Sequence, residues 1–151
     1  MKSVTVVAWI SVLATASPVW SYEEISVTDG NKIKVHRIVA ATDPGHAVNP
    51  AQIERQVAGS FVYGLSALFY GECTVRNGRI EQENFDTYNS MRISEMPKVE
   101  SIIMPTGGDV WGGVGEPTIC VAAPAVLNAI FAATGKRIRT FPLMHHDLRM
   151  A

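Results

Sequence analysis

The segment GGVGEP at residues 112–117 has the residue types and order best suited to chemistry in this chain. It places one carboxylate, Glu116, after a run of glycines and directly before a proline. Five glycines fall within residues 107–115, and glycine lets a backbone approach another group closely. A carboxylate held on such a loop at the start of a helix can act as a general base. The alternative is that Glu116 only complements the helix dipole, which contributes about 0.3–1 kcal/mol.

The other titratable residues form no recognisable motif for a metal or a nucleophile. Cys73 and Cys120 are too far apart for a CxxC pair, and Cys120 lies in an apolar segment. We therefore expect no metal site made by the protein, and we expect Cys120 to be a buried, inert side chain. The histidines and a short basic cluster are expected to be structural or to face solvent: His36, His46, His145, His146, Lys136, Arg137 and Arg139.

Length and composition favour one packed domain. The chain has 151 residues, of which 47% are hydrophobic and 18% charged, so a core can form and wholesale disorder is excluded. The formal net charge is −1 and no run of like charges occurs. The chain therefore lacks the basic footprint of a nucleic-acid-binding protein.

The first 21 residues have two interpretations. Residues 3–22 carry no formal charge, and Ala14, Thr15 and Ala16 resemble a signal-peptide cleavage site. The first interpretation is therefore that residues 1–21 are a leader-like or truncated segment. The other interpretation is a β-strand, because Val4, Val6 and their neighbours also suit a sheet. A cytoplasmic and a periplasmic location both remain open.

The remaining pattern predicts an α+β fold. A hairpin turns at residues 29–31, a second turns at Asn77-Gly78 within residues 72–82, and a further strand covers residues 99–104. One helix is expected at 51–70 from its apolar periodicity. A second is expected at 124–134, after a short turn at 118–122, because Pro124 does not suit a helix interior. We expect the two hairpins and the strand to form one sheet with both helices packed on it.

The helix at 51–70 has a small, polar stripe beside its apolar one. Glycines at positions 59 and 64 each cost about 1 kcal/mol relative to alanine, so a group that approaches the backbone closely is expected there. The alternative is tight packing against a neighbouring element. The polar residues of this stripe are Gln52, Gln56, Ser60 and Tyr63.

Six sequence blocks, in order, resemble the carboxy-terminal part of the molybdenum-binding catalytic subunit of the xanthine dehydrogenase and aldehyde oxidase family. Within that family, the chain looks like the bacterial isoquinoline 1-oxidoreductase beta subunits. The resemblance covers residues 22–143, and residues 144–151 are expected to be a polar tail. The blocks are DPGHAVNP at 43–50, QVAGSFVYGLSALFYGE at 56–72, NGRIEQENFDTY at 77–88, MPKVE at 96–100, GGVGEP at 112–117 and APAVLNAIFAATGKRIRTFPL at 123–143.

The resemblance implies a function as well as a fold. It implies that Glu116 is the catalytic base that deprotonates a molybdenum-bound hydroxide, whose oxygen attacks an aldehyde or N-heteroaromatic substrate while hydride passes to the metal's sulfido group. It implies that Gln56 lies beside a molybdenum-molybdopterin cytosine dinucleotide, and that Gly113, Val114 and Gly115 form the loop next to the metal.

The resemblance also implies partners. They are the upstream part of the catalytic subunit, which shares the cofactor, and an iron-sulfur subunit that takes the electrons. Two alternatives stay open from the sequence: an exported α+β binding module without catalysis, and an inactive truncated fragment.

Overall fold

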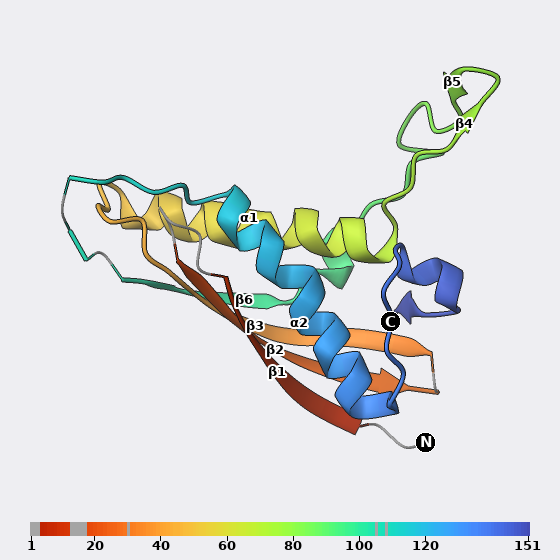
Figure 1. Cartoon of the computed structure of the whole chain (residues 1–151), viewed down its shortest axis with the longest axis horizontal. Helices are drawn as coiled ribbons and strands as arrows, with labels where there is room; N and C mark the ends of the chain where they lie inside the picture. Colours follow the sequence, from red (N-terminus) through yellow and green to blue (C-terminus); the bar gives the residue numbers. More distant parts are fainter. Residues whose placement is uncertain (1–3, 13–17, 30, 105, 108) are drawn as a thin grey trace.

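A five-stranded mixed sheet forms one layer of the molecule (Figure 1). The computed structural model describes residues 4–12 (backbone only), 18–29, 31–104, 106–107 and 109–151. Strands β1, β2 and β3 are antiparallel neighbours, and β6 and β7 both pair in parallel with β3. The strands span Val4–Val12 (β1), Val19–Thr28 (β2), Lys32–Thr42 (β3), Lys98–Ile103 (β6) and Arg149–Met150 (β7).

Two helices share one hydrophobic core with the sheet. Helix α1, Pro50–Phe69, lies against β6, and α2, Glu116–Thr134, crosses α1 and covers β1 and β2. Asn49 caps α1 by accepting a hydrogen bond from the Gln52 backbone, and Pro50 occupies the first turn. The predicted α+β class and the two packed helices are confirmed. The largest buried apolar side chains are Phe61, Phe69, Ile25, Ile33, Ile38, Leu65, Leu68 and Ile130.

Helix α2 begins earlier than the sequence predicts. The expected turn at 118–122 is helical, and Pro124 lies inside the helix, so that part of the prediction is wrong. The carbonyl that Pro124 leaves without its helical partner belongs to Cys120, which is exposed, so solvent can satisfy it. The predicted C-terminal cap is confirmed, because Gly135 adopts a φ of 72° and its N–H bonds to the Phe131 carbonyl at 2.7 Å.

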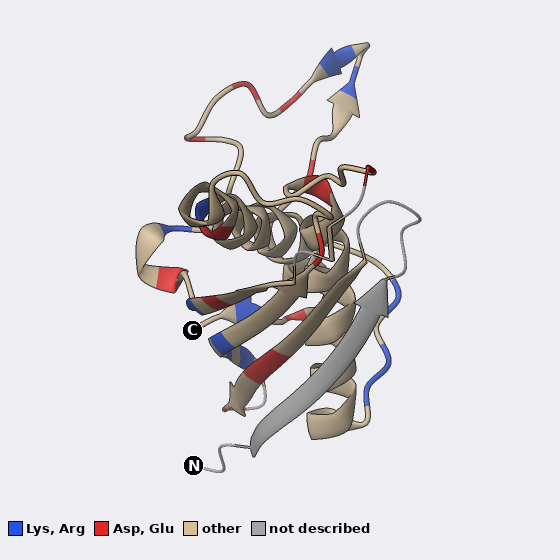
Figure 2. Ribbon diagram, turned by 90° about the vertical axis from the view of Figure 1, so that its left-hand side faces the viewer, with Lys and Arg blue, Asp and Glu red and all other residues tan. Residues whose placement is uncertain are grey.

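The second hairpin stands apart from the sheet. Strands β4 (Val75–Arg76) and β5 (Arg79–Ile80) pair only with each other among the described residues, so the expectation that both hairpins share one sheet is wrong. Asn77 and Gly78 have φ values of 52° and 76°, as the predicted tight turn requires. We call residues 72–90 the arm. It projects from the end of α1 and carries acidic and basic residues interspersed (Figure 2).

Both ends of the described chain belong to the sheet. Residues 4–12 form β1, as the strand interpretation expects, whereas the cleavage-like Ala14, Thr15 and Ala16 lie outside the described residues. The expected polar tail is ordered: a 3-10 turn, Leu143–His146, leads into β7, and Leu148 is buried. A second 3-10 turn, Ile93–Glu95, precedes β6.

Candidate functional site

An open cleft of about 380 Å³ lies where α1 and the start of α2 come together. Its walls are the small, polar stripe of α1 and the first turn of α2. The predicted base and the predicted cofactor-side amide therefore border the same space. The lining residues are Gln56, Gly59, Ser60, Tyr63, Gly115, Glu116 and Ile119.

The two helices meet closely enough to require glycine at one position. A Cβ on Gly64 would lie 2.7 Å from the Ala122 Cβ and 3.0 Å from the Ile119 carbonyl oxygen. Gly64 is therefore explained by tight helix packing. A Cβ on Gly59 would meet nothing within 4 Å, so this glycine leaves open space in the cleft wall.

A buried pair of hydroxyls joins the helices beneath the cleft. Ser60 of α1 and Thr118 of α2 are hydrogen-bonded to each other and are both buried. The Ser60 hydroxyl also lies 2.6 Å from the Val57 carbonyl oxygen, and the Thr118 hydroxyl lies 2.8 Å from that of Gly115. These contacts fix the first turn of α2, and so the backbone of Glu116, against α1.

Glu116 and Gln56 are both available to a ligand. Both are exposed, and neither side chain has a hydrogen-bond partner among the described residues. The Gln56 side-chain nitrogen lies 2.7 Å from the position that a Cβ on Gly115 would occupy. Of the predicted loop residues, only Gly115 lines the cleft. Gly113 and Val114 form the bend before it, where Val114 packs against the core.

A second loop holds the glycine-rich loop in place. One carboxylate oxygen of Asp43 accepts hydrogen bonds from the backbone N–H groups of Gly45 (2.9 Å) and Thr106 (3.3 Å). The Gly45 carbonyl accepts from Gly107 at 2.7 Å, and the Pro44 carbonyl accepts from Gly112 at 2.9 Å. From the sequence, this DPG segment was noted only as part of the block DPGHAVNP at 43–50. Its acidic residue before a proline and a glycine is the signal that could have indicated a loop clamp.

Gly45 is a second site of close backbone approach. It has a φ of 73°, and a Cβ there would lie 2.3 Å from the Val110 carbonyl oxygen. Any larger residue at this position would push the two loops apart.

The other sequence candidates lie away from the cleft or differ from expectation. The prediction that Cys120 is buried is wrong, because it lies on the exposed side of α2 and donates a hydrogen bond to the Glu116 carbonyl at 3.6 Å. His145 pairs with Glu72 at 2.9 Å, and Arg137 lies 3.6 Å from the centre of the Phe131 ring. Over the described ranges, no three His, Cys, Asp or Glu side chains are grouped to hold a metal.

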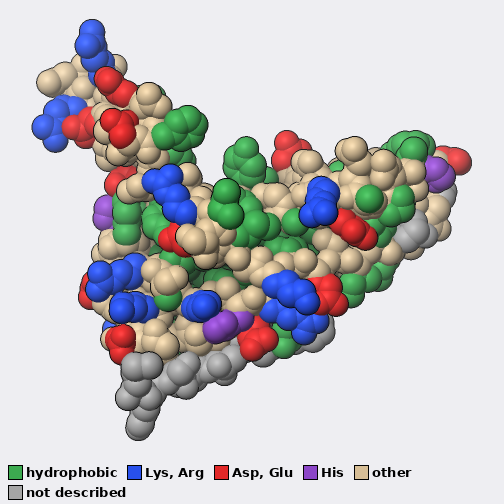
Figure 3. Space-filling view, turned by 180° about the vertical axis from the view of Figure 1, so that it is seen from behind, with side chains coloured by type: hydrophobic (Ala, Val, Ile, Leu, Met, Phe, Trp, Pro, Cys, Tyr) green, Lys and Arg blue, Asp and Glu red, His purple; other side chains and the backbone are tan. Residues whose placement is uncertain are grey.

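A further hollow lies between the arm and α1 (Figure 3). Hydrophobic side chains line it, and Tyr63 belongs to both this hollow and the cleft. The residues that form it are Val62, Tyr63, Ser66, Ala67, Phe85, Tyr88, Ser90 and Met91.

Part of the chain matches a family of cofactor-binding domains. Residues 24–97 match the sequence model of the molybdopterin cofactor-binding domain, a range that contains Gln56. The quinoline 2-oxidoreductase structure from Pseudomonas putida 86 superposes with a TM-score of 0.71 at 19% identity, over 84% of this chain and 17% of that chain. This likeness shows the fold.

Curated relatives indicate the family. The membrane-bound aldehyde dehydrogenase [pyrroloquinoline-quinone] of Gluconacetobacter polyoxogenes is 30% identical over 77% of this chain and 15% of its own length. The isoquinoline 1-oxidoreductase subunit beta of Brevundimonas diminuta is 28% identical over 75% of this chain and 14% of its own length. The chain is homologous to part of the molybdenum-binding subunits of xanthine dehydrogenase and aldehyde oxidoreductase, as the resemblance predicted. It spans about 15% of the length of these relatives.

Proposed function

We propose that residues 22–143 form the carboxy-terminal, cofactor-side region of a molybdenum hydroxylase, in which Glu116 is the base and Gln56 contacts the cofactor. The observation that carries this proposal is the shared cleft, in which the Glu116 carboxylate and the Gln56 amide line one open space without other hydrogen-bond partners among the described residues.

The residues of the cleft fit a pterin cofactor. Such a group presents ring nitrogens and oxygens, which an unpaired glutamine amide can meet as both donor and acceptor. Gly59 and Gly115 leave room beside that amide. When bound, the molybdenum cofactor supplies the metal that oxidises the substrate and takes up its electrons.

The position of Glu116 supports its proposed role as a proton acceptor. It is the first residue of α2, so its backbone is fixed while its carboxylate remains exposed at the cleft. Protons from the reacting centre pass to this carboxylate, and such general-base catalysis contributes typically 10²–10⁴-fold in rate. Gln56 binds and orients, and has no group that takes a proton at neutral pH.

The names of the relatives support a proposed substrate class. Their names include an aldehyde oxidoreductase, an isoquinoline 1-oxidoreductase and a nicotinate dehydrogenase. We propose an aldehyde or N-heteroaromatic substrate, molybdopterin cytosine dinucleotide as the cofactor, and as partners the remaining catalytic-subunit sequence and an iron-sulfur subunit.

The test is a Glu116→Gln substitution in the complete enzyme that contains this chain. The amide keeps the size of the side chain and removes its basicity. We expect turnover to fall at least 10²-fold while the molybdenum content per protein stays unchanged. Turnover within about twofold of the unsubstituted enzyme would refute the role of Glu116.

A further inference from the structure

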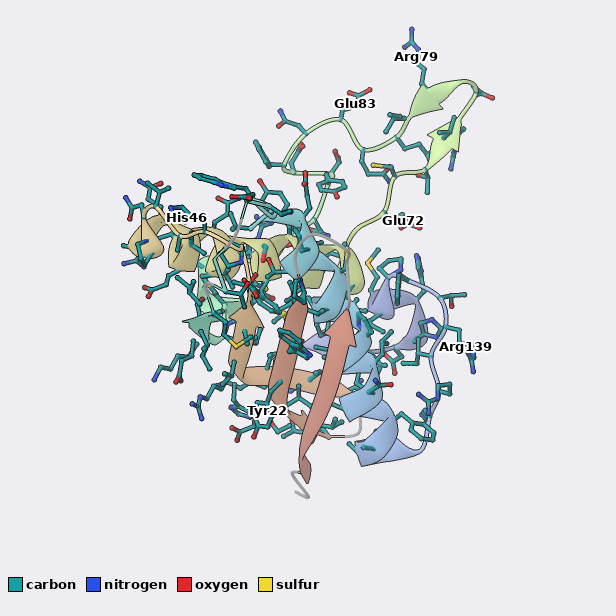
Figure 4. The ribbon with its side chains drawn as sticks, turned by 60° about the vertical axis from the view of Figure 1, so that its left-hand side comes forward. Tyr22, His46, Glu72, Arg79, Glu83 and Arg139 are labelled. Atoms are coloured by element: carbon teal, nitrogen blue, oxygen red, sulfur yellow. The ribbon has the colours of Figure 1, made fainter. Side chains whose placement is uncertain are left out.

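Two exposed rings clamp the loops that precede the cleft. His46, in the DPG loop, stacks on Trp111, in the glycine-rich loop, with ring centres 4.9 Å apart and planes inclined by 30°. The labelled His46 lies beside the start of α1, at the far end of the molecule from the arm (Figure 4). Trp111 is 64% exposed and contributes nothing to the hydrophobic core.

The stack lies next to a hinge of glycines. Gly112, Gly113 and Gly115 follow Trp111 and lead to Glu116. Glycine has the greatest backbone freedom to lose, so this stretch needs external contacts to hold one conformation. The Gly112 N–H donates a hydrogen bond to the Pro44 carbonyl, and these two residues lie one and two positions from Trp111 and His46 in their loops. The two contacts together anchor the chain immediately before the bend.

We propose that His46 and Trp111 are positioning residues for Glu116. The Ser60 and Thr118 contacts hold the bend at its α2 end, and the stack keeps the loop pair closed at its other end. With both ends held, the Gly112 to Gly115 bend presents the carboxylate to the cleft at a fixed place. The inference rests on the proposed function of Glu116. Neither ring lines the cleft, so both residues act through the loop and not by contact with a substrate.

Kinetics of the complete enzyme separate this role from substrate binding. Trp111→Ala is expected to lower kcat roughly 10-fold or more, because a displacement of about 1 Å at a catalytic group can cost 10²-fold. KM is expected to stay within about twofold and the molybdenum content to stay unchanged. Trp111→Phe, which keeps an aromatic face for His46, is expected to restore most of kcat. Val48→Ala, on the same loop as His46 and 72% exposed, is the matched control and is expected to behave as the unsubstituted enzyme.

A double-substitution cycle tests the pair itself. His46→Ala is expected to lower kcat in the same way, and the double variant is expected to be no worse than Trp111→Ala alone, because both changes remove one contact. Effects that multiply would show that the two rings act separately and would overturn the proposal.

Amide hydrogen exchange gives a readout that does not depend on activity. Trp111→Ala is expected to speed exchange in the peptide covering residues 106–115, where Gly107 and Gly112 donate the bonds that join the loops. Trp111→Phe is expected to leave that exchange slow. Unchanged exchange in Trp111→Ala, or a loss expressed in KM instead of kcat, would overturn the proposal.

If Glu116→Gln remains active, the proposed function fails. If Glu116→Gln is inactive and Trp111→Ala is normal, only the positioning role fails.

Discussion

The side-chain nitrogen of Gln56 lies 2.7 Å from the point where Gly115 would carry a Cβ. Real Cβ atoms do not approach a neighbour so closely, so the glycine of the loop and the glutamine of α1 are matched to each other. The backbone of Gly115 itself is unstrained, with φ −101° and ψ −68°. The nearest obstacle to a larger residue at this position is therefore the Gln56 side chain.

Gly115→Ala is expected to displace the Gln56 amide without unfolding the protein, because the obstructing atom ends a flexible side chain. If Gln56 contacts the cofactor, the molybdenum content of the complete enzyme falls in this variant, as it does in Gln56→Ala. Metal analysis of the purified variants measures the effect. The double variant Gly115→Ala/Gln56→Ala serves as the control and is expected to match Gln56→Ala. Full molybdenum content in both single variants would contradict the role of Gln56.

Two glycines of α1 are expected to respond oppositely to alanine. Gly64→Ala places a methyl group against Ala122 and the Ile119 carbonyl, so the free energy of unfolding is expected to fall by about 1–3 kcal/mol. Gly59→Ala meets nothing within 4 Å and is expected to raise the free energy of unfolding by up to about 1 kcal/mol through helix propensity. Denaturant unfolding of the two variants measures both changes. A stabilising Gly64→Ala would mean that the helices are not in contact at this point.

The buried carboxyl of Glu23 is expected to make stability depend on pH. It is fully buried, without a hydrogen-bond partner among the described residues, and burial raises its pKa well above the usual value. At pH values between the ordinary pKa of a glutamate and the raised pKa of Glu23, this carboxyl is protonated in the folded state and ionised in the unfolded state. Stability therefore falls as pH rises through this interval.

Removing that carboxyl should remove this dependence. Glu23→Leu is expected to raise the free energy of unfolding by about 1–3 kcal/mol near pH 8 and by less near pH 4. Glu23→Gln retains an unpaired polar group and is expected to flatten the pH profile with a smaller gain in stability. Thermal unfolding from pH 4 to pH 8 checks both variants. An equal effect at the two pH values would show that the fold does not raise the pKa of Glu23.

The sequence predicted the elements whose periodicity is strong. The apolar stripe within residues 51–70 located α1, and Asn77-Gly78 located the hairpin turn. The start of α2 could not be predicted, because the local penalty of Pro124 in a helix is overcome by tertiary packing, and the helical partner that it removes belongs to an exposed residue, Cys120. The separation of β4 and β5 from the main sheet depends on contacts between distant residues, which no local pattern encodes.

The candidate site was predicted in part. The glycine-rich bend with Glu116 and the polar stripe with Gln56 were visible as local patterns, and the structure places both at one cleft. The Asp43 clamp and the His46 to Trp111 stack were not found, since each joins residues more than 60 positions apart.

Gln56 and Glu116 are proposed to face one bound molybdenum cofactor. An experimental structure of the complete enzyme with its cofactor tests this most directly. We expect the Gln56 amide to contact the cofactor and the Glu116 carboxylate to lie within hydrogen-bonding distance of the reacting centre. A structure in which other protein segments fill this cleft, with the cofactor elsewhere, would contradict it.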